Sequence, residues 1–142
     1  MIEIVIPGEP CAQGRPRFAR RGKFMVAYDP AKSRTWKATA HVALRDAMAG
    51  AGPLQGPLSV EIAATFTCPA SEHRKREPMP RRWHAKRPDV ENVVKAVLDA
   101  GTGVIFLDDN QVTHLVAVKV IGAQGEAPRL WMQVKPIVET PA

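Results

Sequence analysis

The chain has 142 residues, 45% of them hydrophobic, which is enough for one buried core and too little for two independently stable ones. Its 20 lysines and arginines against 14 acidic residues give a net charge of +6, so an anionic partner is expected, nucleic acid first and an anionic membrane second. No run approaches the ~20 apolar residues of a membrane span and the amino terminus lacks a secretion signal, so we expect a soluble cytoplasmic protein.

The first half of the chain predicts short strands around one long helix. An apolar run at residues 2–6 predicts a strand, and the basic and aromatic side chains of residues 15–28 predict a basic hairpin or arm. Apolar side chains then recur at helical spacing from Trp36 to Ala47, so a helix is expected from about Ala31 to Ala49. Alternating apolar positions predict a half-buried strand at residues 58–67.

The second half begins with a segment that lacks apolar periodicity. Residues 69–88 contain four prolines and many basic residues, so a mobile surface loop is expected there. Apolar residues at helical steps from Val90 to Leu98 predict a second helix that ends near Gly101, and strands are expected at residues 112–121 and 129–138. This order predicts a single α/β domain over residues 1–142, with one mixed sheet and two main helices packed on it.

Acidic residues cluster within this basic chain. Five of the 14 acids lie between positions 89 and 109, and such clustering costs electrostatic energy unless a cation binds there. We expect a helix start and a strand start to pack together and to bring these carboxylates within a few ångströms of one another. Hard oxygen ligands suit Mg²⁺, with Mn²⁺ as a substitute, and the two cysteines, Cys11 and Cys68, lack zinc-type spacing and are expected to be reduced and structural. The five acids are Asp89, Glu91, Asp99, Asp108 and Asp109.

Two interpretations of these acids remain open. In the functional one, a metal ion held by the carboxylates activates water at a phosphodiester, and Lys95, one turn beyond Glu91, pairs with that carboxylate or contacts the phosphoryl oxygens. In the structural one, Asp89 is a helix cap and Glu91 with Lys95 is a solvated helix pair. Asp99 lies near a helix C-terminus, where negative charge is disfavoured, and is expected to support the site by holding Lys95 or an arginine.

Twelve of the 20 basic residues lie in two segments outside the predicted helices. Aromatic side chains, among them Phe18, Phe24 and Trp83, are interleaved with them, and this mixture can follow phosphates while stacking on unpaired bases. The alternative is that charged loops keep the protein soluble and that the aromatic residues of the arm are core residues of a hairpin. His84 is expected to be a loop residue or a phosphate contact. The basic residues are Arg15, Arg17, Arg20, Arg21 and Lys23 in the arm, and Arg74, Lys75, Arg76, Arg81, Arg82, Lys86 and Arg87 in the loop.

The order and spacing of the acidic residues resemble the signature of RusA-type Holliday junction resolvases. That signature reads Asp-x-Asp-Asn-x-x-Lys, then Asp-Ala, then Asp-Asp-x-Gln-Val. The matching segments here are Asp89-Val90-Glu91-Asn92-Val93-Val94-Lys95, Leu98-Asp99-Ala100 and Asp108-Asp109-Asn110-Gln111-Val112. Upstream, Gly8-Glu9-Pro10, Gly14-Arg15-Pro16-Arg17 and the first helix extend the likeness over most of the chain.

This resemblance implies a RusA-like fold and a homodimeric crossover junction endodeoxyribonuclease. Such an enzyme nicks four-way or branched DNA in pairs with Mg²⁺, serves recombination and repair, associates with the nucleoid and needs neither a membrane nor an organic cofactor. The implied catalytic residues are Asp89, Glu91, Lys95 and Asp109, with the three acids and Asp108 as metal ligands; Asn92, Asp99 and Gln111 would support or orient the site.

One position departs from the family pattern. Glu91 stands where the family has its second Asp, which preserves a Mg²⁺ ligand but moves the carboxylate by about one bond length. Two other functions also remain open from the residues alone. One is a protein that holds branched DNA without cutting it, and the other is a metal-dependent hydrolase of nucleotides or RNA.

Overall fold

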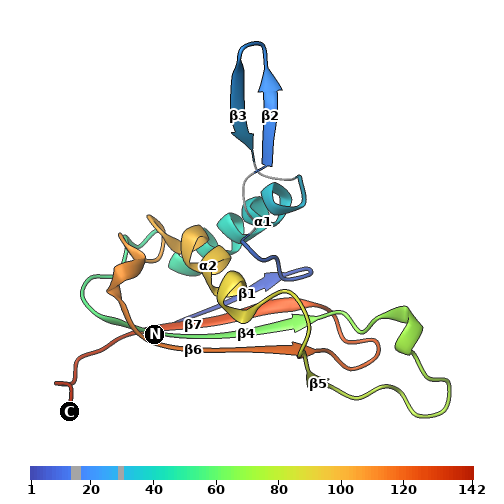
Figure 1. Ribbon diagram of the computed structural model, residues 1–142. Helices are drawn as coiled ribbons and strands as arrows, with labels where there is room; N and C mark the ends of the chain where they lie inside the picture. The colour runs from blue at the N-terminus through green and yellow to red at the C-terminus, as the bar shows by residue number, and fades with distance from the viewer. Residues whose placement is uncertain (14–16, 29–30) are drawn as a thin grey trace.

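The computed structural model describes residues 1–13, 17–28 and 31–142 (Figure 1). Five strands form a main sheet in the order β1-β7-β4-β6-β5, and β2 pairs with β3 in a separate hairpin. No helix in these ranges is long and apolar enough to cross a membrane. The elements are β1 (Ile2–Pro7), β2 (Arg17–Arg21), β3 (Phe24–Tyr28), α1 (Ala31–Met48), β4 (Leu58–Phe66), β5 (Arg82–Trp83), α2 (Val90–Gly101), β6 (Val112–Ile121) and β7 (Arg129–Pro136), with short 3-10 turns η1 (Ala70–Glu72) and η2 (Asp109–Gln111).

The main sheet is mixed and both helices lie on one of its faces (Figure 1). β4 runs parallel to β6 and antiparallel to β7, and β1 and β5 are antiparallel to β7 and β6 respectively. A parallel pair needs a long crossover, and α2 lies within the connection between β4 and β6. The predicted α/β fold with one mixed sheet and two helices is confirmed.

The core lies between the sheet and the two helices. In β4, Leu58, Val60 and Ile62 alternate toward the helices, and they pack in one cluster with the inward residues of β1 and β7. From α1 this cluster includes Trp36, Ala40, Leu44 and Met48, which recur every four residues, and from α2 it includes Val93, Val94, Ala96, Val97 and Ala100. Both cysteines are buried free thiols, in agreement with the expected structural role.

The expected arm is the hairpin of β2 and β3, which projects from the helix side of the molecule (Figure 1). Gly22 at its tip has a φ of 63°, a left-handed conformation that glycine adopts without strain. Phe18 and Phe24 are exposed, so the alternative that these aromatic residues form a core of the hairpin is wrong. Arg15 lies outside the described residues, as do the side chains of Arg17 and Tyr28.

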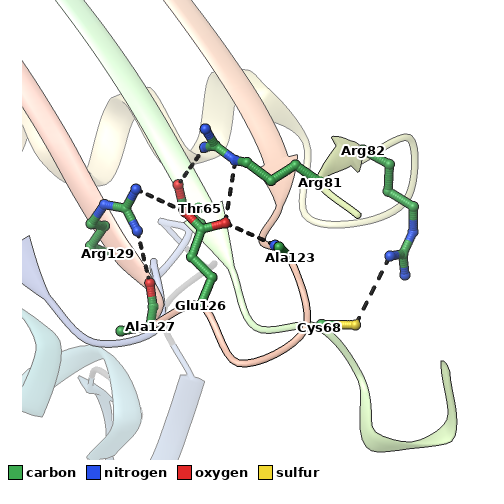
Figure 2. Close-up of polar contacts among 8 residues, drawn as sticks. All are labelled: Thr65, Cys68, Arg81, Arg82, Ala123, Glu126, Ala127 and Arg129. Carbon is green, nitrogen blue, oxygen red and sulfur yellow. Dashed lines mark hydrogen bonds and ion pairs between the residues drawn. The ribbon is translucent and has the colours of Figure 1, made fainter. Parts of the chain in front are cut away.

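The basic segment of residues 69–88 contains η1 and β5 and is anchored at several points. The side chain of Gln124 accepts hydrogen bonds from the backbone nitrogens of Arg74 and Met79. Figure 2 shows Arg81 reaching Thr65 and the carboxylate of Glu126. Gln124 is 50 and 45 positions from Arg74 and Met79 in sequence, and Thr65 is 16 positions from Arg81. The mobility of the segment stays a prediction.

Candidate active site

Asp89 and Glu91 lie together at the N-terminal end of α2. The carbonyl of Asp89 accepts the backbone N–H groups of Asn92 and Val93, but its carboxylate makes no capping hydrogen bond to the helix. Both carboxylates are exposed and line a surface pocket of about 710 Å³. The other residues of this pocket are His84, Ala85, Lys86, Arg87, Val90 and Lys119. A pair of carboxylates without protein partners, surrounded by basic residues, is suited to a cation and a phosphate together.

Lys119 fixes the path of the chain into this pocket. It pairs with the buried Ala64 in the sheet register and so lies on the helix side of β6. Its ammonium donates hydrogen bonds to the carbonyl oxygens of Lys86, at 2.7 Å, and of Pro88. The sequence interpretation missed Lys119, although a lysine on the inward side of an otherwise apolar strand was a signal for it.

His84 forms another wall of the same pocket. Its backbone N–H donates to the carbonyl of Lys119, and its ring meets Phe66 edge to face at 4.7 Å between centroids. Partial burial lowers the pKa of His84 below 6.5, and the charges of Lys119 and Lys86 lower it further. The imidazole is therefore neutral at physiological pH. A second cavity, of about 640 Å³, shares residues 84–87 with the first and adds Lys32 and Arg82 to the basic residues of this surface.

Lys95 lies one turn after Glu91 and lines a neighbouring apolar groove of about 390 Å³ with it. Both are exposed, and no ion pair within 4.0 Å joins them in the described part of the chain. The remaining residues of the groove are Val90, Val94, Leu115 and Ala117. The carbonyl of Asn92 accepts a hydrogen bond from Gln13, which ties the segment after β1 to α2.

The second part of the predicted site is the η2 turn before β6. Asp108 accepts a hydrogen bond from the backbone of Asn110, and Gln111 accepts two, from Leu107 and Asp108. The side-chain nitrogen Nε2 of Gln111 donates hydrogen bonds to the backbone carbonyls of Leu54 and Gly56, each at 3.0 Å. Gln111 therefore holds the acidic turn against the loop that precedes β4.

Asp109 lies in an acidic environment at the C-terminal end of α2. Burial raises the pKa of Asp109, a hydrogen bond and the charge of Asp108 raise it further, and the charge of Asp99 adds to this effect. The charge of Asp99 therefore acts on Asp109, and the expected contact of Asp99 with Lys95 or an arginine stays a prediction. Asp99 and Asp108 thus repel the negative charge of Asp109 near a helix end that itself carries negative partial charge.

Asp109 does not meet Asp89 and Glu91 within one chain, contrary to the expected packing of a helix start on a strand start. α2 has 12 residues and spans about 18 Å. It runs back along β6, so Asp89 lies near Lys119 at the far end of that strand, whereas Asp109 precedes its first residue. In the described ranges no three His, Cys, Asp or Glu side chains are grouped to hold a metal ion.

The basic residues proposed for DNA binding divide into exposed and anchored groups. Arg81 pairs with Glu126 and Arg82 contacts Cys68 (Figure 2). Arg82 also pairs with Glu72. The exposed members within the described residues are Arg20, Arg21 and Lys23 on the hairpin, Arg74, Lys75 and Arg76 after η1, and Lys86 and Arg87 beside Asp89. Of these residues, Lys86 and Arg87 line the pocket of Asp89 and Glu91, together with Lys119.

Comparison with known proteins agrees with this arrangement. Residues 7–135 match the model of a family described as endodeoxyribonuclease RusA. The chain is also similar to the uncharacterized protein YqaN of Bacillus subtilis (strain 168), with 32% identity over 142 residues that cover 96% of each chain. The family match spans both acidic segments, both helices and the strands of the main sheet other than β1, of which it includes only Pro7. The chain therefore belongs to the RusA family of endodeoxyribonucleases.

Proposed function

We propose that this protein is a Mg²⁺-dependent, structure-selective endonuclease that resolves four-way DNA junctions as a homodimer by paired phosphodiester hydrolysis. The observation that carries the proposal is the pocket in which Asp89 and Glu91 lie among Lys86, Arg87 and Lys119, with no ion pair to either acid in the described part of the chain. Membership of an endodeoxyribonuclease family supports the reaction class.

The donor set fits Mg²⁺ in its chemistry, because carboxylate oxygens are hard ligands. When bound, the ion lowers the pKa of a water molecule and offsets charge on the phosphodiester. Asp89, Glu91 and Asp109 would hold it, with Asp108 beside them, and Lys86 and Arg87 would bind the flanking phosphates. Lys95, exposed one turn beyond Glu91, would stabilise negative charge on the phosphoryl oxygens.

The separation of the acids along α2 gives the dimer a specific role. Among the residues that the structure describes, nothing pairs with the outer edge of β6 from Val112 to Val118, since β5 pairs only with Val120 and Ile121 and the backbone of His84 after it bonds Lys119. These seven residues contain no acid, lysine, arginine or proline, the residues that normally protect an edge strand from pairing. A second copy of the same edge is therefore its proposed partner.

A two-fold axis near Leu115 would pair this edge with itself, antiparallel, because Leu115 is the middle residue of the free segment. The second copy's β6 would then begin near Val118 of the first. Asp109 of the second copy would lie beyond that point, in the region of Lys119 and Asp89 of the first. Two composite acidic sites result, one for each cut of a paired cleavage.

The experiment mixes two inactive variants. Asp89→Asn and Asp109→Asn should each lose nicking of a labelled four-way junction while still binding it. Their heterodimer contains one site with Asp89 from one copy and Asp109 from the other, so mixing should restore single nicks at up to half the wild-type number of sites. Two separate intrachain sites would leave the mixture inactive.

The same assay separates the other candidate functions. Intact strands in Mg²⁺ despite tight binding, with Asp109→Asn behaving as wild type, would indicate a junction-binding protein without nuclease activity. Competition among branched DNA, linear duplex and RNA identifies the preferred substrate. Chelation of Mg²⁺ should abolish nicking and leave junction binding measurable.

A further inference from the structure

The β2–β3 hairpin carries large apolar side chains that the described chain leaves uncovered. Phe18, Phe24 and Met25 are 65%, 75% and 63% exposed, and Val26 is 41% exposed. An isolated two-stranded hairpin is only marginally stable in water, and this one pairs with no strand of the main sheet in the described residues. Clustered exposed apolar side chains of this kind mark a binding surface.

The register places apolar and cationic side chains on both faces of the hairpin. Arg20 is paired with Met25 and shares its face with Phe18, whereas Arg21 is paired with Phe24 on the opposite face. A flat partner would cover one face and leave the other in water. The partner must therefore enclose the hairpin from two sides.

The charge of the segment indicates what encloses it. Residues 10–28 contain five basic residues and no acid. Arg20 donates to the carbonyl of Gly22, which stabilises the tip, and Lys23 projects there as an exposed cation. The partner should therefore be a cleft with negative charge at its edges and apolar surface inside. A DNA groove or an opened base stack has this character, because phosphates line its edges and bases lie within.

We propose that this hairpin inserts at the branch point of a DNA junction, where Phe18 and Phe24 stack on bases left unstacked by the branching. Arg20, Arg21 and Lys23 neutralise the phosphates on either side. In a linear duplex the same insertion first requires base steps to unstack, which costs a few kcal/mol, whereas a branch point presents exposed bases already. This inference rests on the proposed function and adds the element that distinguishes branched from linear DNA.

The test uses the full chain and 2-aminopurine, whose fluorescence rises when it unstacks, placed either at the branch point or within one arm. Binding is measured in EDTA so that no cleavage occurs. Wild type should raise the branch-point signal alone. The double variant Phe18→Ala with Phe24→Ala should abolish that rise and weaken junction binding at least about tenfold, with less than about twofold change for linear duplex, since stacking on each base contributes ~1–3 kcal/mol.

Two matched double variants test whether the effect comes from the aromatic side chains of the hairpin. Val42→Ala with Val138→Ala removes exposed apolar groups elsewhere and should change nothing, and Phe18→Trp with Phe24→Trp should retain the signal. Equal losses on junction and duplex would overturn the proposal in favour of a general phosphate contact. A change in molecular mass of the alanine variant would assign the hairpin to contact with a second copy instead.

Failure of this inference is distinguishable from failure of the proposed function. If wild type cuts the junction in Mg²⁺ but gives no fluorescence change, the insertion is wrong and the nuclease remains. If wild type neither binds nor cuts any branched DNA, both are wrong.

Discussion

Asp89 and Asp109 lie at opposite ends of helix α2 in the same chain. Asp89 directly precedes the helix beside the loop held by Lys119, and Asp109 follows it in a turn where Asp99 and Asp108 raise its pKa. An ion site that used both carboxylates would therefore take them from two copies, as in the dimer proposed above, and nicking would then depend on the integrity of that dimer.

Leu115→Asp should dissociate the dimer. A carboxylate in the middle of the free β6 edge would face its own copy across the two-fold axis, where like charges repel and a buried charge is costly. Sedimentation should show the mass of one chain, and nicking should be lost with it. Val138→Asp, at an exposed position near the C-terminus, is the control. A dimeric Leu115→Asp protein would exclude this edge as the interface.

Lys119→Met should destabilise the fold and impair the site. Methionine keeps most of the apolar stem but removes the ammonium that binds two carbonyls, and hydrogen bonds of charged groups contribute about 1.5–3 kcal/mol. We expect urea unfolding to show a loss of about 2 kcal/mol at an unchanged m value, together with weaker Mn²⁺ binding. Lys135→Met, on the exposed end of β7, is the matched control. Unchanged stability and Mn²⁺ binding would show that these hydrogen bonds do not matter in solution.

Glu126 should make stability depend on pH in the acid range. The backbone N–H of Ala123 lowers the pKa of Glu126 below 4.5, and Arg129 and Arg81 lower it further (Figure 2). An acid whose pKa falls on folding stabilises the native state above its unfolded pKa, and this contribution disappears as the pH falls through the folded pKa.

Glu126→Gln should therefore cost about 1–2 kcal/mol of unfolding free energy at pH 7, and less as the pH drops below 4.5. Urea titrations of both proteins between pH 7 and pH 3 measure this difference. Glu139→Gln, in the exposed C-terminal segment, should show no such dependence. A constant difference between Glu126→Gln and wild type at all pH values would contradict the assigned cause.

Replacing Arg74, Lys75 and Arg76 with alanine should weaken DNA binding and its salt dependence. Each lost phosphate contact lowers the slope of log affinity against log salt by about 0.9. These three are exposed, whereas Arg81 and Arg82 have protein partners and their loss would also disturb the fold. Arg45→Ala with Lys135→Ala is the control, and an unchanged slope for the triple variant would remove this segment from the interface.

The sequence predicted the elements of the fold well because their signals are local. Helical spacing from Trp36 to Ala47 predicted α1 to within one residue at its end, and alternation in residues 58–67 predicted β4. The anchoring of residues 69–88 was not predictable, because Lys119, Gln124 and Glu126 hold that segment through contacts distant in sequence and leave no periodic pattern within it.

The candidate site, like the fold, could be predicted from the sequence only in part. The spacing of Asp89, Glu91 and Asp109 identified the residues of the family signature but not where they lie, since a helix start can pack against either end of a strand. The direction of α2 along β6 decides this, and it follows from the crossover between two parallel strands rather than from any residue near the site. The residue types indicated the chemistry, but the separation of Asp89 from Asp109 along α2 could not be predicted from them.

The position of β7 in the sheet sets when this protein can fold during its synthesis. β7 is the last strand made, yet it lies between β1, the first, and β4. Until residues 129–136 have left the ribosome, β1 has no neighbour in the main sheet and the central strand β4 is open on one side. The core can therefore close only after residues 129–136 have been synthesised, because a chain that ends before residue 129 lacks the strand that joins β1 to β4.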